Sequence, residues 1–471
     1  MPDQLRHDFV GCYGAGFVRT PNVDRLAARG VRFGQAYSLH PVCVPARASL
    51  LLGQHALRTG VLDNQHYVPP DYRARGLATW PELLNARGYY TAAIGKMHFY
   101  PWDARFGFQH RRIAEDKRWL HIRDDYWHFL RERGERKYHG KESAGYFENK
   151  GAVEARLHLE LGWDHWVGEE AAHFIRQHGK DGPFAMMVGF PGPHCPYDPA
   201  AESLAGIDPT AMPEPLPDAG DTPKLLAQTI AGNKRPWNGV DYTEFTRAQK
   251  LKIRAHYAAL VQQIDAEVGR ILDALEEQGL TEDTVVIFSS DHGDALGDHG
   301  LIGKAQFFES AWHVPMIAAG PGIAPGVVDD FVTLTDVTAT MLAFGGAERP
   351  SWMDARPLPG LGLADGRAHD ELIGALHNGW AIQRGTWRLA KYQTGEAVLF
   401  DLADDPDEQR NRVDDPGCRA IYRELDAALT SAVMAGMASA HQALIVGDAE
   451  LSQSTPFGRE GWQRVYPAPA R

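Results

Sequence analysis

Apolar and polar positions alternate along this chain first at strand spacing and then at helix spacing. Residues 31–37 alternate apolar and polar side chains, a two-residue period that predicts a strand. Residues 46–54 follow with helical character, and residues 284–288 form a later apolar run. This order of strands and helices predicts an α/β fold with a mostly parallel central sheet flanked by helices.

Capping residues mark the ends of several expected helices. The longest helical pattern covers residues 247–278, keeps its apolar residues on one face, and stops at Gly279. Shorter helices are expected over residues 22–29 and 79–87, the second opening with capping-box spacing. A strand over residues 89–94 follows the second of these.

The residue pattern changes at about residue 365 and divides the chain into two parts. We expect residues 1–365 to form the main domain and residues 366–471 a smaller C-terminal antiparallel α+β subdomain with a tail. Residues 100–170, rich in aromatic and basic side chains and poor in strand pattern, and residues 200–240, rich in Pro and Gly and expected to be a long loop, are expected to be insertions that shape a pocket. The stretch after residue 435, with Trp462 and Tyr466, leaves open whether it covers the pocket or contacts a second subunit of a homo-oligomer.

Bulk composition excludes several classes of function. Hydrophobic residues make up 44% and charged residues 23% of the chain, as in globular proteins. A formal net charge of −13 argues against nucleic-acid binding, and no apolar run is long enough to span a membrane. No signal peptide follows Met1, and four scattered cysteines without CxxC spacing predict free thiols. We therefore expect a cytoplasmic protein.

The pentapeptide at residues 43–47 is the most informative segment. Cys43 lies where an expected strand turns into an expected helix, and unpaired N–H groups at such a turn favour an anion or a thiolate. Arg47 is one turn further on and can reach back over the same spot. Cys43 is therefore a candidate nucleophile, while a small buried cysteine remains the alternative from these residues alone.

Other expected strands also end in residues capable of chemistry. Asp291 and His292 follow an apolar strand, which suits either a divalent cation or an aspartate that caps the next helix. Lys96 and His98 lie two positions apart in an extended segment, so both are expected on the same side. His194 follows the expected strand 184–190 in a Pro-rich loop, where a rigid surface turn is the alternative.

These motifs together resemble those of the type I sulfatases of the alkaline-phosphatase-like superfamily. Cys-x-Pro-x-Arg at residues 43–47 is followed by Ala-Ser-Leu-Leu-Leu-Gly, and a second signature covers residues 88–98. The resemblance implies that a formylglycine-generating enzyme oxidises Cys43 to formylglycine. It also implies hydrolysis of a sulfate monoester, on a small molecule or a saccharide, to an alcohol and inorganic sulfate.

The resemblance also implies a metal site. Its expected ligands are Asp3, Gln4, Cys43, Asp291 and His292, and its expected ion is Ca²⁺, with Mg²⁺ and Mn²⁺ as alternatives. Gln4 stands where many sulfatases carry a second aspartate, and an amide oxygen is a weaker ligand. The resemblance further implies that the chain begins at the end of a buried strand, so either the true start lies upstream or a central strand is missing.

The remaining site residues receive roles by the same resemblance. Arg47, Lys96 and Lys304 supply positive charge to the transferring sulfate group. His98 is the expected base that lets the hydrated aldehyde expel sulfate. His194, with help from Lys304, is expected to protonate the leaving alcohol.

Two other functions remain open. A phosphonate monoester or phosphodiester hydrolase shares the nucleophile and the metal site, although Gly-Lys-Met-His at residues 95–98 speaks against it. A non-catalytic sulfatase-like binding protein is the alternative from another class. The substrate is open as well: residues 102–166 hold aromatic side chains that suit a sugar or a quaternary ammonium, and arginines that suit a second anionic group. Alternatively, those arginines pair with Glu115, Asp116 and other acids in a solvated face.

Overall fold

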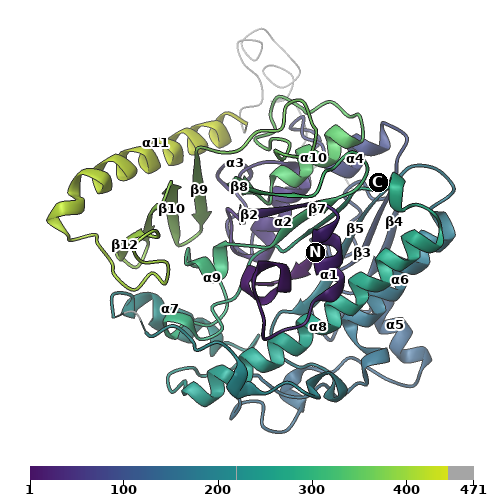
Figure 1. Ribbon diagram of the computed structural model, residues 1–471, viewed down its shortest axis with the longest axis horizontal. Helices are drawn as coiled ribbons and strands as arrows, with labels where there is room; N and C mark the ends of the chain where they lie inside the picture. Colours follow the sequence, from purple (N-terminus) through teal and green to yellow (C-terminus); the bar gives the residue numbers. More distant parts are fainter. Residues whose placement is uncertain (219, 444–471) are drawn as a thin grey trace, which may run out of the picture.

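A parallel four-stranded sheet forms one half of the central structure (Figure 1). The structure, a computed structural model, describes residues 1–218 and 220–443. The strand order is β1-β5-β3-β4, and all neighbouring strands run parallel. The strands are β1 (Pro2–Asp3), β5 (Phe184–Pro193), β3 (Tyr90–Gly95) and β4 (His110–Ile113).

A second sheet of four strands has mixed directions. Its order is β6-β7-β2-β8, with β7 antiparallel to both of its neighbours and β2 parallel to β8. The strands are β6 (Val286–Ser289), β7 (Met316–Ala319), β2 (Val31–Tyr37) and β8 (Gly326–Thr333). The predicted α/β class is confirmed.

Helices cover both faces of these sheets. Successive side chains of a strand point to opposite faces, so each face has its own apolar cluster against which helices pack. In β3, Ala92 and Ile94 belong to one apolar cluster and Ala93 to another. Helices α1 (Pro21–Ala28), α6 (Trp163–His178) and α8 (Arg247–Glu277) contribute to the first cluster, with α6 and α8 side by side. Helices α2 (Cys43–Leu52), α4 (Trp80–Asn85) and α10 (Asp336–Phe344) contribute to the second.

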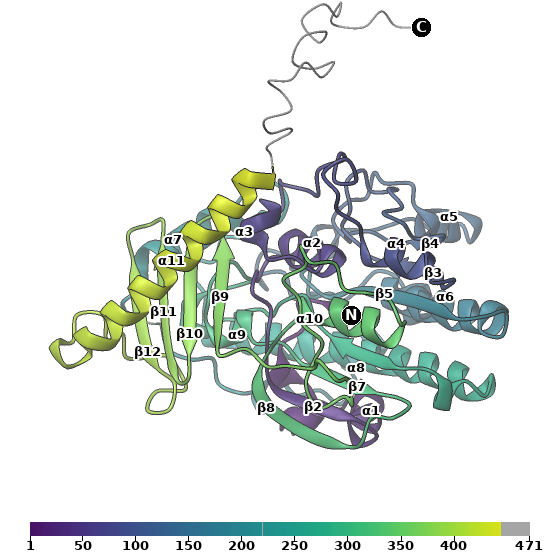
Figure 2. The same ribbon diagram turned by 90° about the horizontal axis from the view of Figure 1, so that it is seen from above.

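A separate antiparallel sheet forms the C-terminal unit. Its strands are β9 (Glu371–Leu376), β10 (Gly379–Arg384), β11 (Trp387–Tyr392) and β12 (Ala397–Asp401). Helix α11 (Arg419–Ala443) lies along one face of this sheet, as Figure 2 shows, and packs Leu425 and Leu429 onto it. The predicted antiparallel unit is confirmed, whereas the domain boundary at residue 365 stays a prediction.

An apolar cavity of about 590 Å³ separates the two central sheets between β5 and β6. β1 contributes only Pro2 and Asp3 beside it, and the ammonium group of Met1 donates a hydrogen bond to Val188 O at 2.8 Å. Burial lowers the pKa of this ammonium group to about 5.

Several elements differ from the sequence predictions. Residues 200–240 are not one long loop, because α7 (Pro223–Asn233) forms there with Pro223 in its first turn and Leu225 buried. Residues 100–170 contain β4 and the short helix α5 (Asp125–Glu132). Trp462 and Tyr466, expected over the pocket or a partner, lie outside the described residues. Within the described part of the chain, no helix is long and apolar enough to cross a membrane.

Candidate active site

The predicted site residues meet at the ends of strands. Asp3 ends β1, Lys96 directly follows β3, and His194 directly follows β5. Asp291 comes two residues after β6, and Cys43 is the first residue of α2. Because parallel strands end at the same edge of a sheet, these segments deliver their side chains to one place.

Cys43 lies at the centre of this place and is fully buried. Its Sγ atom is 3.0 Å from Lys304 Nζ and 3.3 Å from His292 Nε2. Burial by itself raises the pKa of a thiol, but the charges of Lys304 and His292 outweigh it and hold the pKa of Cys43 well below its usual value. The helix begins at Cys43, three residues earlier than the sequence predicts, and the N–H group of Val44 in its first turn donates to Asn64 Oδ1 at 3.0 Å.

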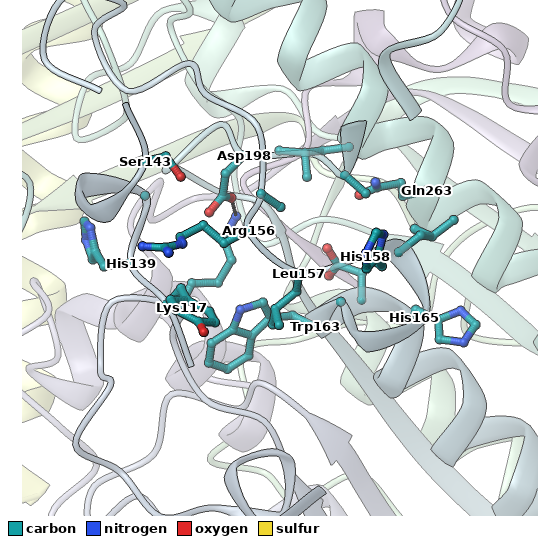
Figure 3. A pocket seen from close by; sticks show the side chains of 18 residues that line it. Lys117, His139, Ser143, Arg156, Leu157, His158, Trp163, His165, Asp198 and Gln263 are labelled. Atoms are coloured by element: carbon teal, nitrogen blue, oxygen red, sulfur yellow. Dashed lines mark hydrogen bonds and ion pairs between the residues drawn. The ribbon is translucent and has the colours of Figure 1, made fainter. Parts of the chain in front are cut away.

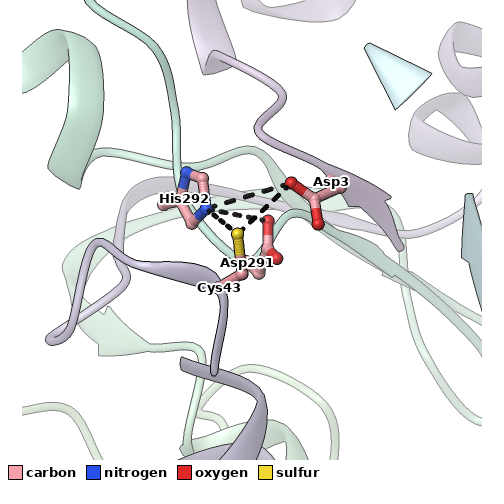
Figure 4. Close-up of side chains that lie close together, drawn as sticks. All are labelled: Asp3, Cys43, Asp291 and His292. Atoms are coloured by element: carbon pink, nitrogen blue, oxygen red, sulfur yellow. Dashed lines mark hydrogen bonds and ion pairs between the residues drawn. The ribbon is translucent and has the colours of Figure 1, made fainter. Parts of the chain in front are cut away.

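Four side chains could hold a metal ion. One ligand atom each from Asp3, Cys43, Asp291 and His292 lies within 4.8 Å of the other three, and Figure 4 shows the four side chains converging. All four are buried. His292 Nδ1 lies 2.9 Å from Gly293 O and donates to it, which leaves Nε2 free to face the cluster. Two carboxylates and an imidazole form a donor set that a divalent cation fits.

Arg47 fixes the outer oxygens of both carboxylates. Its Nε atom donates to Asp291 Oδ2 at 2.8 Å and its Nη2 atom to Asp3 Oδ2 at 3.1 Å. The Oδ1 atoms of both carboxylates therefore point toward His292 Nε2. This nitrogen lies 3.7 Å from Asp291 Oδ1 and 4.0 Å from Asp3 Oδ1. Burial and the neighbouring charge of Asp3 raise the pKa of Asp291, as expected for two carboxylates buried side by side.

Gln4 makes different contacts from those expected of a metal ligand. Its Oε1 atom accepts a hydrogen bond from Lys304 Nζ at 2.7 Å, and its Nε2 atom donates to Asp294. The backbone at Gln4 has a positive φ of 73°. In the structure the amide oxygen thus positions Lys304, and the role of Gln4 as a ligand stays a prediction.

Lys96 is buried between two carboxylates. Its Nζ atom lies 2.7 Å from Asp3 Oδ2 and 2.9 Å from Asp116 Oδ2. Burial lowers the pKa of a lysine, but these two partners more than offset it and raise the pKa of Lys96 above its usual value. Lys96 is therefore a permanent positive charge beside the cysteine.

The backbone at His98 differs from the one that its spacing from Lys96 predicts. β3 ends at Gly95, and His98 adopts a left-handed backbone with φ of 60°, so the extended segment assumed from the sequence is wrong. The carboxylate of Glu115 holds this backbone by accepting the His98 N–H at 3.1 Å. The ring packs edge-on against Trp119, and its buried Nδ1 atom has no partner among the described residues.

His194 and Lys304 form a pair. His194 Nδ1 lies 2.6 Å from Cys195 O and donates to it, so Nε2 carries a lone pair that accepts from Lys304 Nζ at 2.7 Å. Burial and the charge of Lys304 lower the pKa of His194 to about 3. The imidazole is therefore neutral.

Sequence patterns did not identify two buried acids of the site. Glu115 and Asp116 were candidates for a solvated face, yet their exposed fractions are 0% and 1%. Asp116 accepts from Lys96 and also from Arg118, whose Nε atom lies 2.6 Å from Asp116 Oδ1. No motif marks these acids, because their function depends on partners that come from other parts of the fold.

A small cavity of about 50 Å³ lies outside the nucleophile cluster. Figure 3 shows Lys117, Trp163 and Asp198 around it. Lys117 Nζ donates to Pro196 O at 2.8 Å, so this cavity borders the back of the loop that carries His194. None of the predicted site residues lines it, and we assign it no role in the chemistry.

Comparisons with known proteins agree with this geometry. A family model described as "Sulfatase" matches residues 1–347, and one described as "N-sulphoglucosamine sulphohydrolase, C-terminal" matches residues 297–434. The chain is 32% identical to a choline-sulfatase of Rhizobium meliloti over 88% of this chain and 82% of the relative. It is 30% identical to an arylsulfatase of Clostridium perfringens over 88% of this chain and 89% of that relative.

Solved structures share the fold. A phosphonate monoester hydrolase of Agrobacterium radiobacter superposes with a TM-score of 0.77 at 24% identity, covering 92% of this chain and 94% of that one. A protein solved with its substrate D-glucosamine-2-N,6-O-disulfate superposes with a TM-score of 0.72 at 22% identity, covering 92% and 96%. At these identities the likeness establishes the alkaline-phosphatase-like architecture.

Proposed function

Because the chain belongs to the sulfatase family and is a sulfuric ester hydrolase, we propose that Cys43 is its nucleophile position. In this proposal a formylglycine-generating enzyme oxidises Cys43, and the product hydrolyses a sulfate monoester to an alcohol and inorganic sulfate. One observation carries it. Cys43 opens a helix in a buried site, with a metal-type donor set on one side and Lys304 at 3.0 Å on the other.

The modified residue would allow the enzyme to release the sulfate group that becomes bound to it during each turnover. A hydrated aldehyde supplies one hydroxyl for attack on sulfur and a second whose deprotonation expels the bound sulfate. Cys43 is enclosed on all sides, so the hydrate would be held in a single orientation. His98 is the base for the expulsion, since its buried Nδ1 atom has no hydrogen-bond partner among the described residues.

A divalent cation is proposed at the four-atom cluster, with Ca²⁺ expected and Mg²⁺ or Mn²⁺ as alternatives. When bound, it would supply Lewis acidity and positive charge beside position 43. Asp3, Asp291 and His292 would hold it together with the modified residue. Arg47 keeps the two carboxylates oriented toward this ion through their outer oxygens.

Sulfate binding and departure of the alcohol fall to the lysines and His194. Lys96 and Lys304 place fixed positive charge where the transferring group gains negative charge. Neutral His194 cannot donate a proton until it receives one. We therefore propose that Lys304 supplies the proton and that His194 relays it to the leaving alcohol.

A phosphonate monoester hydrolase is the second candidate, because two proteins of that activity share the fold. Sulfatase relatives of 30% and 32% identity favour the sulfate ester instead. Steady-state rates on 4-nitrophenyl sulfate and on a matched 4-nitrophenyl phosphonate decide between them. A higher kcat/KM on the phosphonate would overturn the proposed function.

The role of Cys43 is tested with two cysteine variants. We expect Cys43→Ala to lose turnover of 4-nitrophenyl sulfate and to unfold at the temperature of the unmodified chain. Cys12→Ala serves as the control. Cys12 lies outside the site, in the segment between the amino terminus and α1, and its backbone N–H donates to Asp24. Normal turnover by Cys43→Ala would exclude the nucleophile.

A further inference from the structure

Arg118 is the outermost of three charges that begin beside the nucleophile. Lys96 Nζ bonds Asp116 Oδ2 at 2.9 Å, and Arg118 bonds the same carboxylate through Nε and Nη2. The side chains of Lys96 and Asp116 are 1% exposed, whereas that of Arg118 is 13% exposed. The guanidinium therefore lies nearer to solvent than Lys96 and Asp116.

Part of this guanidinium is free to bind a ligand. Asp116 occupies Nε and Nη2, and no described residue accepts a hydrogen bond from Nη1. An arginine fork binds carboxylate and sulfate oxygens through such N–H groups. The charge of Arg118 also contributes to the low pKa of His194, which places it close to the leaving-group side of the site.

Trp237 and Lys141 extend this feature into a basic rim, defined here as Arg118, Lys141 and Trp237. The guanidinium of Arg118 lies 5.0 Å from the centre of the Trp237 ring, which is 40% exposed. Lys141 Nζ donates to Pro236 O, next to Trp237, and makes no ion pair with any described residue. Both charges help to lower the pKa of His139 to about 4, after its burial, so they lie on the same side of the molecule.

The charge balance of the rim favours an anion. Arg118 has Asp116 as its acidic partner and shares it with Lys96, which also pairs with Asp3, and Lys141 has no acidic partner among the described residues. A quaternary ammonium would meet uncompensated positive charge here, and Arg118 already covers a face of Trp237. Tyr67 and Tyr100, whose rings lie 5.0 Å apart, offer the competing aromatic surface for a cation.

We propose that the basic rim binds a second anionic group, a carboxylate or a further sulfate, on the alcohol part of the substrate. Arg118 acts as a residue that determines specificity, and the preferred substrates are sulfate esters whose leaving group is itself an anion. This inference rests on the proposed sulfatase activity.

Matched nitrophenyl sulfates test the preference directly. The four esters carry, at the same ring position, hydrogen, a carboxylate, a second sulfate or a trimethylammonium group. For the metal-loaded chain at low salt we expect kcat/KM to be about tenfold higher with either anionic group than with hydrogen, as for a charge-assisted hydrogen bond. We expect the trimethylammonium ester to fall below the hydrogen ester. The two anionic arms show which group the rim prefers.

Variants then assign the preference to Arg118. Arg118→Met is expected to reduce the ratio of anionic to hydrogen ester by about tenfold, and Arg118→Lys by less, because the charge remains and the fork is lost. The ratio is the readout, because removing Arg118 takes a partner from Asp116 and so also affects Lys96. That effect lowers the rates with all four esters alike. Arg123→Met is the control: it removes an exposed arginine of the same segment that stacks on Trp127. Lys141→Met, also expected to lower the ratio, replaces Arg118→Met if that variant does not fold.

Each outcome decides a different statement. Turnover of all four esters without a preference for the anionic ones would overturn the inference and leave the proposed function intact. So would a preference for the trimethylammonium ester, which would point to Tyr67 and Tyr100. No turnover of any sulfate ester by the modified chain would overturn the proposed function, and the inference with it.

Discussion

At the scale of single residues, the site is a set of buried charges that alternate in sign. Arg47 lies between Asp3 and Asp291, and Lys96 lies between Asp3 and Asp116. Removing one partner from such a buried set is costly, because the remaining charge loses both water and its counter-ion. The same arrangement leaves two carboxylate oxygens and an imidazole nitrogen facing one point, which is the basis of the metal proposal.

A metal at this point should stabilise the folded chain. We expect one equivalent of divalent ion in the purified protein, and a lower melting temperature after treatment with a chelator. Asp291→Asn should contain little metal and should show almost no change in melting temperature with the chelator. Asp273→Asn, which alters an exposed aspartate paired with Arg25, should behave as the unmodified chain. An equal response to the chelator in Asp291→Asn would exclude this metal site.

Lys304 is expected to affect chemistry more than substrate binding. It touches Cys43, His194 and Gln4, and we assign it both charge stabilisation and the proton of the leaving group. Lys304→Met should lower kcat by about 100- to 1000-fold. The loss should shrink for esters with a better leaving group, such as dinitrophenyl sulfate, which needs no proton. An equal loss of kcat for 4-nitrophenyl sulfate and for dinitrophenyl sulfate would contradict the role of Lys304 as the proton source.

At the scale of elements, sequence reasoning located the strands and helices that carry the motif residues. The expected strands over 31–37 and 184–190 and the long helix over 247–278 agree with β2, β5 and α8. Each has a strong apolar period. The start of α2 at Cys43 was missed, as was α7, because single turns and short helices depend on tertiary packing more than on local pattern.

Partner residues were harder to predict than motif residues. Lys96, His194 and Lys304 stand in motifs, and the structure brings them together with Cys43. Asp116 contacts Lys96 from 20 positions away along the chain. Such a contact follows from how β3 and the loop after β4 pack together, and no local pattern encodes it.

A buried acid of α6 holds the end of β5 that leads into His194. Asp164 in α6 accepts the Gly192 N–H at 2.8 Å, and burial raises its pKa from 3.8 to about 6. The folded chain therefore holds this proton more tightly than the unfolded chain, so stability falls as pH rises from about 4 to 6.

Asp164→Asn should remove this dependence, because the amide keeps the acceptor but does not ionise. Between pH 4 and pH 7 the unfolding free energy of the unmodified chain should fall by up to about 3 kcal/mol more than that of the variant. Urea denaturation at both pH values measures the gain. Asp181→Asn, an exposed aspartate just after α6, is the control. Parallel pH profiles for Asp164→Asn and the unmodified chain would contradict the assignment.

At the scale of the whole molecule, a buried arginine joins the C-terminal sheet to the main body. Arg388 in β11 is fully buried and donates to Glu408 at 2.7 Å, to Phe307 O at 3.1 Å and to Glu309. Glu309 opens the short helix α9 (Glu309–Trp312), which comes five residues after Lys304. The C-terminal sheet therefore supports the segment that carries a site lysine.

Arg388→Met should destabilise the chain by about 3–5 kcal/mol, since it leaves the buried carboxylate of Glu408 without its ion-pair partner and removes one partner of Glu309. Arg384→Met, in the neighbouring strand β10, removes an arginine whose side chain is 38% exposed, and it should cost less than about 1 kcal/mol. Chemical denaturation gives both values. Similar losses for the two variants would show that the buried network does not hold the sheet in place.

The mass of the tryptic peptide covering residues 33–47 tests the central claim most directly. The chain is produced together with a formylglycine-generating enzyme, and turnover of 4-nitrophenyl sulfate is measured on the same sample. We expect the peptide to be lighter by the exchange of the Cys43 thiol for an aldehyde, and we expect activity to rise in proportion to the converted fraction. Full activity in a sample whose Cys43 is entirely unmodified would contradict the account.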